Sequence, residues 1–146
     1  MNPQNELSSL TELIFTLHNR VTVWKTISAS NTGLSPSQSN ALEIIGHNYS
    51  LKMKELASQL GVSTGTLTAT IDRLEKKKLV VRKNSEHDRR SIMLYLTENG
   101  RALFLDNYKK QLEFTRAMTT SLTAADKKAL LSALDCIVGK LREMTP

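Results

Sequence analysis

This chain of 146 residues contains few of the residues that build catalytic or covalently cross-linked sites. Cys136 is the only cysteine, which excludes an intrachain disulfide, and without cysteine partners a structural zinc site is not expected. The three histidines, His18, His47 and His87, are too widely separated in sequence to form a close metal-ligand pair. Serines and threonines are abundant but form no specific triad pattern, and residues 61–65 lack the Gly-Lys-Ser/Thr ending of a phosphate loop. We therefore expect no enzyme, no cofactor and no bound metal.

Long apolar runs are also missing. No stretch approaches the roughly 20 apolar residues that a transmembrane helix needs. The first residues, MNPQNELSS, have neither the basic region nor the apolar core of a secretory signal. We expect a cytoplasmic protein without a membrane partner.

The positive charge of the chain is concentrated in its central part. The whole chain has a formal net charge of +6, and residues 52–101 hold 11 Lys and Arg against 6 Asp and Glu, a net of +5. The remainder has a net charge of only +1. A charge localised in this way favours a polyanionic partner and salt-sensitive binding. Nucleic acid fits better than a membrane surface, because no strongly apolar helix face accompanies the basic one.

The sequence of residues 51–77 predicts two short helices joined by a tight turn. The inward positions of the first helix are Met53, Leu56, Ala57 and Leu60. Gly61 supplies a turn where a side chain would be costly, and Val62 is expected to fill that turn. Ser63 suits the N-cap of the second helix, whose inward residues are Leu67, Ile71 and Leu74. This pattern is typical of a helix-turn-helix.

The outward face of the second helix is small at its start and basic toward its end. At 100° per residue, Gly65, Ala69, Asp72 and Lys76 lie opposite the inward face, flanked by Thr68 and Arg73. Such a face can enter a major groove and contact base edges, while the helix N-terminus can bind phosphate. The alternative is an ordinary solvated helix face.

A basic β-ribbon is predicted to follow, with strands over residues 79–83 and 91–96. The connection between them is too polar to be core and contains Arg89 and Arg90, which suit a narrow, negative minor groove. Asp88 does not favour DNA by itself, and we expect it to orient a nearby arginine through a charge-assisted hydrogen bond.

Amphipathic helices flank this central module. A first helix over about residues 6–28 has the apolar stripe Leu7, Leu10, Ile14, Leu17, Val21 and Trp24. A second helix is expected to begin after the Ser35 cap, and residues 48–50 are expected to link it to the helix-turn-helix. A helix from Thr97 to about Met118 presents the apolar residues Ala102, Leu105, Leu112 and Phe114.

The last helix follows a capping box formed by Thr123 and Asp126. It carries Leu130, Leu134, Ile137 and Leu141, and Cys136 is expected to be buried on one of its faces. The stripes of the two terminal helices exceed what the central module can cover. We infer a two-fold homodimer with interleaved terminal helices, which would place two recognition helices about one DNA turn apart. The alternative is a monomeric bundle.

Short motifs follow one another along this region: Leu34-Ser35-Pro36-Ser37-Gln38, Glu55-Leu56-Ala57, Gly61-Val62-Ser63, Thr68, Asp72-Arg73-Leu74, Leu79-Val80, Asp88-Arg89-Arg90 and Leu96-Thr97-Glu98-Asn99-Gly100. Together they resemble the MarR family of winged helix-turn-helix transcriptional regulators over roughly residues 34–101. The Asp-x-Arg wing followed by Leu-Thr-x-x-Gly is the most specific part. One departure is Lys78, where the family usually has glycine, so either an unusual turn or a different helix end is expected there.

The resemblance implies a mainly α fold with a small β-wing. A winged helix-turn-helix lobe would span residues 34–97, and residues 1–33 and 98–146 would form a helical dimerisation region. The implied function is a sequence-specific DNA-binding regulator, most simply a homodimeric repressor of its own or a neighbouring gene. We expect DNA contacts from Ser63, Thr64, Thr66, Thr68, Ala69, Arg73, Lys76, Lys77, Lys83, Arg89 and Arg90. Of these, Arg90 is the arginine of the family's Asp-x-Arg pattern.

Members of the family commonly respond to small aromatic or phenolic anions. Arg20, Trp24 and His47 combine a cation, an aromatic plane and a titratable donor, and we expect them to line such a ligand pocket. Trp24 alternatively fits the dimer stripe, and Arg20 and His47 alternatively are solvated or capping residues. Two other readings of the chain are a dimeric ligand- or protein-binding scaffold and a metal-responsive DNA-binding regulator. The wing arginines argue against the first, and the scattered histidines argue against the second.

Overall fold

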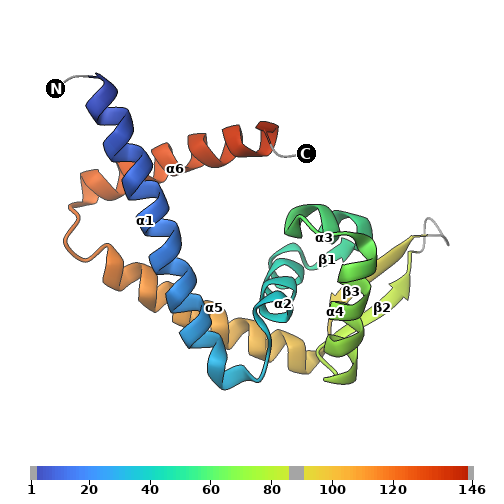
Figure 1. The fold of residues 1–146 in the computed structure, drawn as a ribbon. Coiled ribbons are helices and arrows are strands. Elements are labelled where there is room, and N and C mark those ends of the chain that lie inside the picture. The colour runs from blue at the N-terminus through green and yellow to red at the C-terminus, as the bar shows by residue number, and fades with distance from the viewer. Residues whose placement is uncertain (1–2, 86–90, 145–146) are drawn as a thin grey trace.

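A computed structural model of the chain describes residues 3–85 and 91–144. Two regions differ in their architecture (Figure 1). One contains the long helices α1 (Pro3–Ala29), α5 (Glu98–Met118) and α6 (Ala124–Met144). The other contains the short helices α2 (Pro36–Asn48), α3 (Met53–Leu60) and α4 (Thr64–Lys76) together with a small sheet. The predicted fold class, mainly α with a small β-wing, is confirmed.

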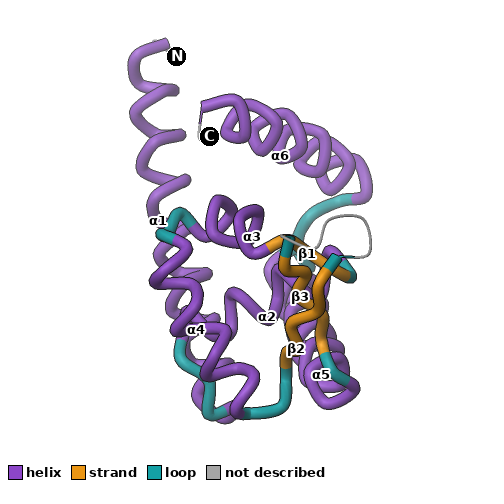
Figure 2. The backbone as a smooth tube through the Cα atoms, turned by 90° about the vertical axis from the view of Figure 1, so that its right-hand side faces the viewer, coloured by secondary structure: helices purple, strands orange, loops and turns teal. Residues whose placement is uncertain are grey.

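The sheet has three antiparallel strands in the order β1-β3-β2. The wing strands β2 (Val80–Asn84) and β3 (Ile92–Leu96) agree with the predicted ribbon to within one residue at each end. Strand β1 (Ser50–Lys52) was not predicted, and the interpretation of residues 48–50 as a simple link was wrong at Asn48, which ends α2, and at Ser50, which begins β1. A strand of three residues is too short to show an alternating pattern, and its pairing with β3 depends on the fold (Figure 2).

The core forms where α2, α3 and α4 pack against the sheet. Leu67, Ile71 and Leu74 are buried, as their helical spacing predicts. They contact a cluster that also contains Leu34, Ala41, Leu42, Ile45, Leu51, Leu56, Ala57, Val80, Leu94 and Phe104. Local capping stabilises the helix starts, because Ser35 and Gln38 form a reciprocal capping box before α2.

One prediction about the central lobe was wrong, and the structure adds a core residue on α5. Val62 does not fill the turn: its side chain is exposed, and the turn closes instead through Val62 N–H donating to the Ala57 carbonyl at 3.1 Å. On α5 the residue that enters the core is Phe104, whereas Leu105 and Leu112 remain exposed. Phe104 fits there because Gly46 of α2 has no side chain, and a Cβ on Gly46 would lie 2.3 Å from the Phe104 ring.

The terminal helices leave most of their apolar stripes uncovered within the single chain, although Val21 and Trp24 of α1 are half-buried. Along α6, which the structure describes in full, no residue is buried. Cys136 is therefore exposed, and its prediction as a buried residue was wrong for the isolated chain. Among residues 3–85 and 91–144, no helix is both long and apolar enough to span a bilayer.

Candidate nucleic-acid interface

Helix α4 presents the polar face that the sequence predicts. The Ser63 hydroxyl accepts a hydrogen bond from the Thr66 backbone N–H at 3.1 Å and so caps the helix. Because the apolar residues of α4 face the core, the opposite side is left to solvent. Every predicted DNA contact on this segment is exposed: Ser63, Thr64, Thr66, Thr68, Ala69, Arg73, Lys76 and Lys77.

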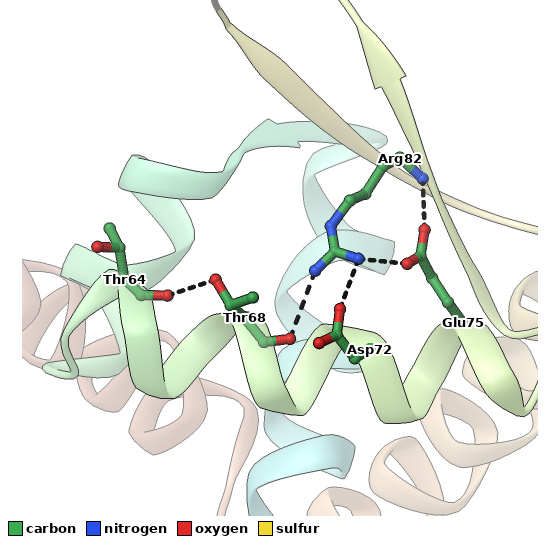
Figure 3. A network of polar contacts seen from close by, with 5 residues as sticks. All are labelled: Thr64, Thr68, Asp72, Glu75 and Arg82. Carbon is green, nitrogen blue, oxygen red and sulfur yellow. Dashed lines mark hydrogen bonds and ion pairs between the residues drawn. The ribbon is translucent and has the colours of Figure 1, made fainter.

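Two threonine hydroxyls on this face already have partners within the protein. The Thr66 hydroxyl lies 3.0 Å from that of Ser63, and the Thr68 hydroxyl donates to the Thr64 carbonyl at 2.8 Å. A hydroxyl that donates within its own helix keeps its lone pairs for a donor on a ligand. Thr68 is thus held in one orientation on the outward face (Figure 3).

The basic residues near the end of α4 differ from one another. Arg73 and Lys76 are exposed, whereas the Lys77 amine donates to the Gly33 carbonyl at 2.9 Å, in the turn between α1 and α2. Lys83 is exposed on β2, and its amine lies 5.3 Å from the centre of the Tyr95 ring. The predicted wing contacts Arg89 and Arg90, with the orienting residue Asp88, lie outside the described residues.

Lys78 adopts the unusual turn that was one of the two expectations for this position. Its φ is +58°, in the left-handed region that favours glycine. A lysine there costs on the order of 1 kcal/mol in backbone energy. The turn is stabilised on both sides, since Lys78 N–H donates to the Glu75 carbonyl at 2.8 Å and the Thr97 hydroxyl donates to the Lys78 carbonyl at 2.7 Å.

Arg82 is a residue that the sequence reasoning missed. It lies on β2, and its guanidinium donates to the Asp72 carboxylate at 2.8 Å, to the Glu75 carboxylate and to the Thr68 carbonyl at 3.4 Å (Figure 3). The Arg82 backbone N–H donates to the second Glu75 oxygen at 3.1 Å. The wing strand is therefore attached directly to the outward side of α4. A signal for it exists in the sequence, because Asp72 and Glu75 are three residues apart on one helix face.

The structure does not bring the three predicted ligand-binding residues together. Trp24 lines a cavity of about 520 Å³ between α1, α2 and α5 and stacks on Phe114, with ring centres 4.1 Å apart. His47 lines a separate cavity and packs edge-on against Phe104, at 5.0 Å between ring centres. Arg20 lines neither of these two cavities. The three residues thus do not all line one of these two cavities, and their joint role in binding a ligand stays a prediction.

The cavity that contains Trp24 has cations that the sequence reasoning did not identify. Lys25 and Lys110 both line it. Glu43 of α2 connects the three helices that surround this cavity. Its carboxylate accepts hydrogen bonds from the Lys25 amine of α1 at 3.2 Å and from the Gln111 amide of α5 at 2.8 Å. In the part of the chain that the structure describes, no three His, Cys, Asp or Glu side chains form a group that could hold a metal ion.

The geometry defines a winged helix-turn-helix protein, and comparison with known proteins agrees. Residues 34–92 match the MarR family model. The organic hydroperoxide resistance transcriptional regulator of Bacillus subtilis (strain 168) is 40% identical over 103 residues, which cover 70% of this chain and 69% of that protein. The uncharacterized HTH-type transcriptional regulator YfiV of the same organism is 33% identical over 105 residues, which cover 71% of this chain and 65% of YfiV, just under two thirds of its length.

The fold also matches the crystal structure of Streptococcus pneumoniae FabT in complex with DNA. The TM-score is 0.81 at 20% sequence identity, over 94% of this chain and 99% of that chain. The chain belongs to the MarR family of transcriptional regulators, which are not enzymes.

Proposed function

We propose that the chain is a sequence-specific, double-stranded DNA-binding transcriptional regulator. The observation that carries the proposal is the outward face of α4, where small and hydroxyl-bearing residues precede Arg73 and Lys76 and all are exposed. Small residues at the start of the helix allow its backbone to approach base edges, and the basic end faces phosphates. In this proposal residues 34–97 form the DNA-binding lobe.

The proposed regulator acts as a homodimer through residues 1–33 and 98–146. The stripe on α1 is open to solvent in the single chain, with Leu7, Leu10, Ile14 and Leu17 between 53% and 67% exposed. Leu130, Leu134, Ile137 and Leu141 of α6 are between 40% and 51% exposed. Burying such a surface against a second copy is strongly favourable, at about 25 cal/mol for each Å² of apolar area removed from water. A dimer would place two copies of α4 on a near-palindromic operator.

Repression that is released by a small aromatic anion completes the proposal. The cavity between α1, α2 and α5 supports it, because Trp24 offers an aromatic face and Lys25 and Lys110 offer positive charge. Glu43 links this cavity to α2, which packs against α4 in the DNA-binding lobe. A bound anion that competes with Glu43 for Lys25 would thereby act on the lobe that contacts DNA.

The test is binding of the purified protein to its own upstream DNA and to scrambled DNA of equal length, measured by fluorescence anisotropy at two salt concentrations. Preference for the upstream DNA that persists at the higher salt is the expected result. Equal binding to both duplexes that salt abolishes would mean either that the operator lies elsewhere or that the affinity is only nonspecific. No binding even at low salt would favour the rival function, a ligand- or protein-binding scaffold with a winged fold.

A further inference from the structure

We infer that Arg82 is a positioning residue that sets the wing strand β2 relative to the recognition helix α4 and thereby controls which sequences the protein prefers. The inference rests on the proposed DNA-binding function. It concerns a side chain that faces the protein, because three groups of α4 hold the guanidinium and its side chain is only 23% exposed.

The partners of Arg82 span two turns of one face of α4. Thr68, Asp72 and Glu75 are related by steps of four and three residues, so their groups lie in a row along the helix. One guanidinium nitrogen donates to both carboxylates and the other donates to the Thr68 carbonyl (Figure 3). Such a row fixes both the distance and the angle of the strand, which a single ion pair would not.

The backbone of Arg82 adds a second attachment at the same position. Its N–H donates to Glu75 at 3.1 Å, so Glu75 receives both the main chain and the side chain of one strand residue. Arg82 pairs with Leu94 of β3 in the sheet register, and Leu94 is buried in the core. The attachment therefore positions the whole ribbon, because β3 cannot shift without disturbing the core.

The arrangement also compensates the negative charge of the recognition helix. The Asp72 side chain is 52% exposed and that of Glu75 is 31% exposed, on a helix that we propose to lie against phosphates. One nitrogen of Arg82 pairs with both carboxylates while the other donates to the Thr68 carbonyl, and the single ammonium of a lysine does not reproduce this two-pronged geometry. Two effects of Arg82 on DNA binding, charge compensation and positioning, must therefore be separated by experiment.

Two variants separate them. Arg82→Lys keeps the charge but loses the fork. The double variant Glu75→Gln/Arg82→Met keeps the net charge of the protein, and the glutamine oxygen can still accept the backbone N–H of residue 82. Lys83→Met is the matched control, because it removes a positive charge from the next residue of the same strand, which is exposed and whose amine lies over the Tyr95 ring of β3.

The probes are a duplex that the wild-type protein enriches from a random-sequence pool and a scrambled duplex of equal length. For both Arg82 variants we expect the ratio of specific to nonspecific affinity to fall about tenfold, because a displaced wing no longer matches the base pairs that α4 selects. The salt dependence of binding should stay unchanged for the double variant. Lys83→Met should instead lower the slope of log K against log salt by about one, with the preference retained.

Each other outcome contradicts the inference in a distinct way. An unchanged preference in both Arg82 variants would show that the attachment does not control sequence selection. A slope lowered by about one in the double variant would make Arg82 a phosphate contact instead. If the double variant loses its helical circular dichroism spectrum, the inference is tested by the ratio of specific to nonspecific affinity of Arg82→Lys alone. If the wild-type protein enriches no sequence, the proposed function fails first, and this inference falls with it.

Discussion

Gly100 of α5 lies directly against the backbone carbonyl of Leu79, at the start of the wing. A Cβ built on Gly100 would be 1.9 Å from that carbonyl oxygen. The same oxygen accepts the Thr97 backbone N–H at 3.0 Å, and the Thr97 hydroxyl accepts the Gly100 N–H at 3.0 Å. The Leu-Thr-x-x-Gly motif therefore connects strand β3 to α5, and at this connection the chain packs against the backbone that follows α4.

Replacing Gly100 with alanine should destabilise the fold. The contact is with backbone, which cannot rotate away, so an overpacking cost of about 1–3 kcal/mol or more is expected in the free energy of unfolding. Urea denaturation followed by circular dichroism, at one fixed protein concentration, measures it. Gly139→Ala is the control, because a Cβ there meets nothing within 4 Å and alanine is the better helix former by about 1 kcal/mol. Equal effects of the two changes would contradict the close approach at Gly100.

The neighbouring lysines Lys76 and Lys77 should behave differently in DNA binding. Lys76 is exposed at the end of α4, whereas the Lys77 amine is held by the Gly33 carbonyl. Lys76→Met should lower the salt slope of DNA binding by about one, as the loss of one phosphate contact does. Lys77→Met, which removes the same charge one residue later, should change the slope less and lower stability instead. If Lys77→Met lowers the salt slope of DNA binding more than Lys76→Met does, Lys77 is the phosphate contact, as its sequence position suggests.

Charge on the α1 stripe should prevent dimerisation without unfolding the chain. Leu17 is 53% exposed in the single chain, so Leu17→Glu buries no charge there, but in the proposed dimer it would place a carboxylate in an apolar interface. Light scattering during size-exclusion chromatography should report a monomer for this variant. Phe15→Glu is matched to it, because Phe15 is 65% exposed on the opposite side of the same helix. A dimer that survives Leu17→Glu but not Phe15→Glu would assign the interface to the other face.

Trp24 makes the cavity directly observable, because it is the only tryptophan in the chain. Benzoate, as a simple aromatic anion, should produce a saturable change in its fluorescence. Lys25→Met should weaken this binding about tenfold or more, the size expected for the loss of a charge-assisted hydrogen bond. Arg20→Ala should leave the affinity unchanged, since Arg20 does not line the cavity. A fluorescence titration that does not saturate would contradict the proposal that aromatic anions are ligands. A loss of affinity for benzoate in Arg20→Ala would show that Arg20 belongs to the binding site.

Acid should weaken the start of α6 through Asp126. The hydrogen bond from the Thr123 hydroxyl, and after it the one from the Thr123 backbone N–H, holds the pKa of Asp126 below its ordinary value of 3.8. Because the folded pKa is lowered, the stabilisation is fully present above about pH 4 and is lost as the pH falls through the lowered pKa. Urea midpoints at pH 7 and pH 3 should therefore differ less in Asp126→Asn than in the wild type.

Asp135→Asn, which removes a second carboxylate from the same helix, controls for net charge in that comparison. The two variants should differ in their response to acid. If Asp135→Asn reduces the difference between the midpoints as much as Asp126→Asn does, the effect is one of overall charge and not of the capping box.

Much of the lobe could be predicted from sequence because its determinants are local. The N-caps at Ser35, Ser63 and Thr97 depend on residues three positions away, and the buried face of α4 depends only on helical periodicity. The exposed stripes of α1 and α6 are read from the same periodicity. The turn at Lys78 was instead one of two expectations that followed from the resemblance to the MarR family, which usually has glycine there.

Other features were decided by contacts between elements that sequence spacing does not determine. Arg82 is attached to residues 7, 10 and 14 positions away, and the Lys77 amine reaches a carbonyl 44 positions away. Phe104 rather than Leu105 enters the core because α5 crosses α2 at Gly46. Periodicity tells which side of a helix is apolar, but the crossing of two helices selects which side chain is buried and which cation meets which carboxylate. The sequence thus determined the fold and the outward face of the recognition helix, and the tertiary structure determined how the wing is attached to it.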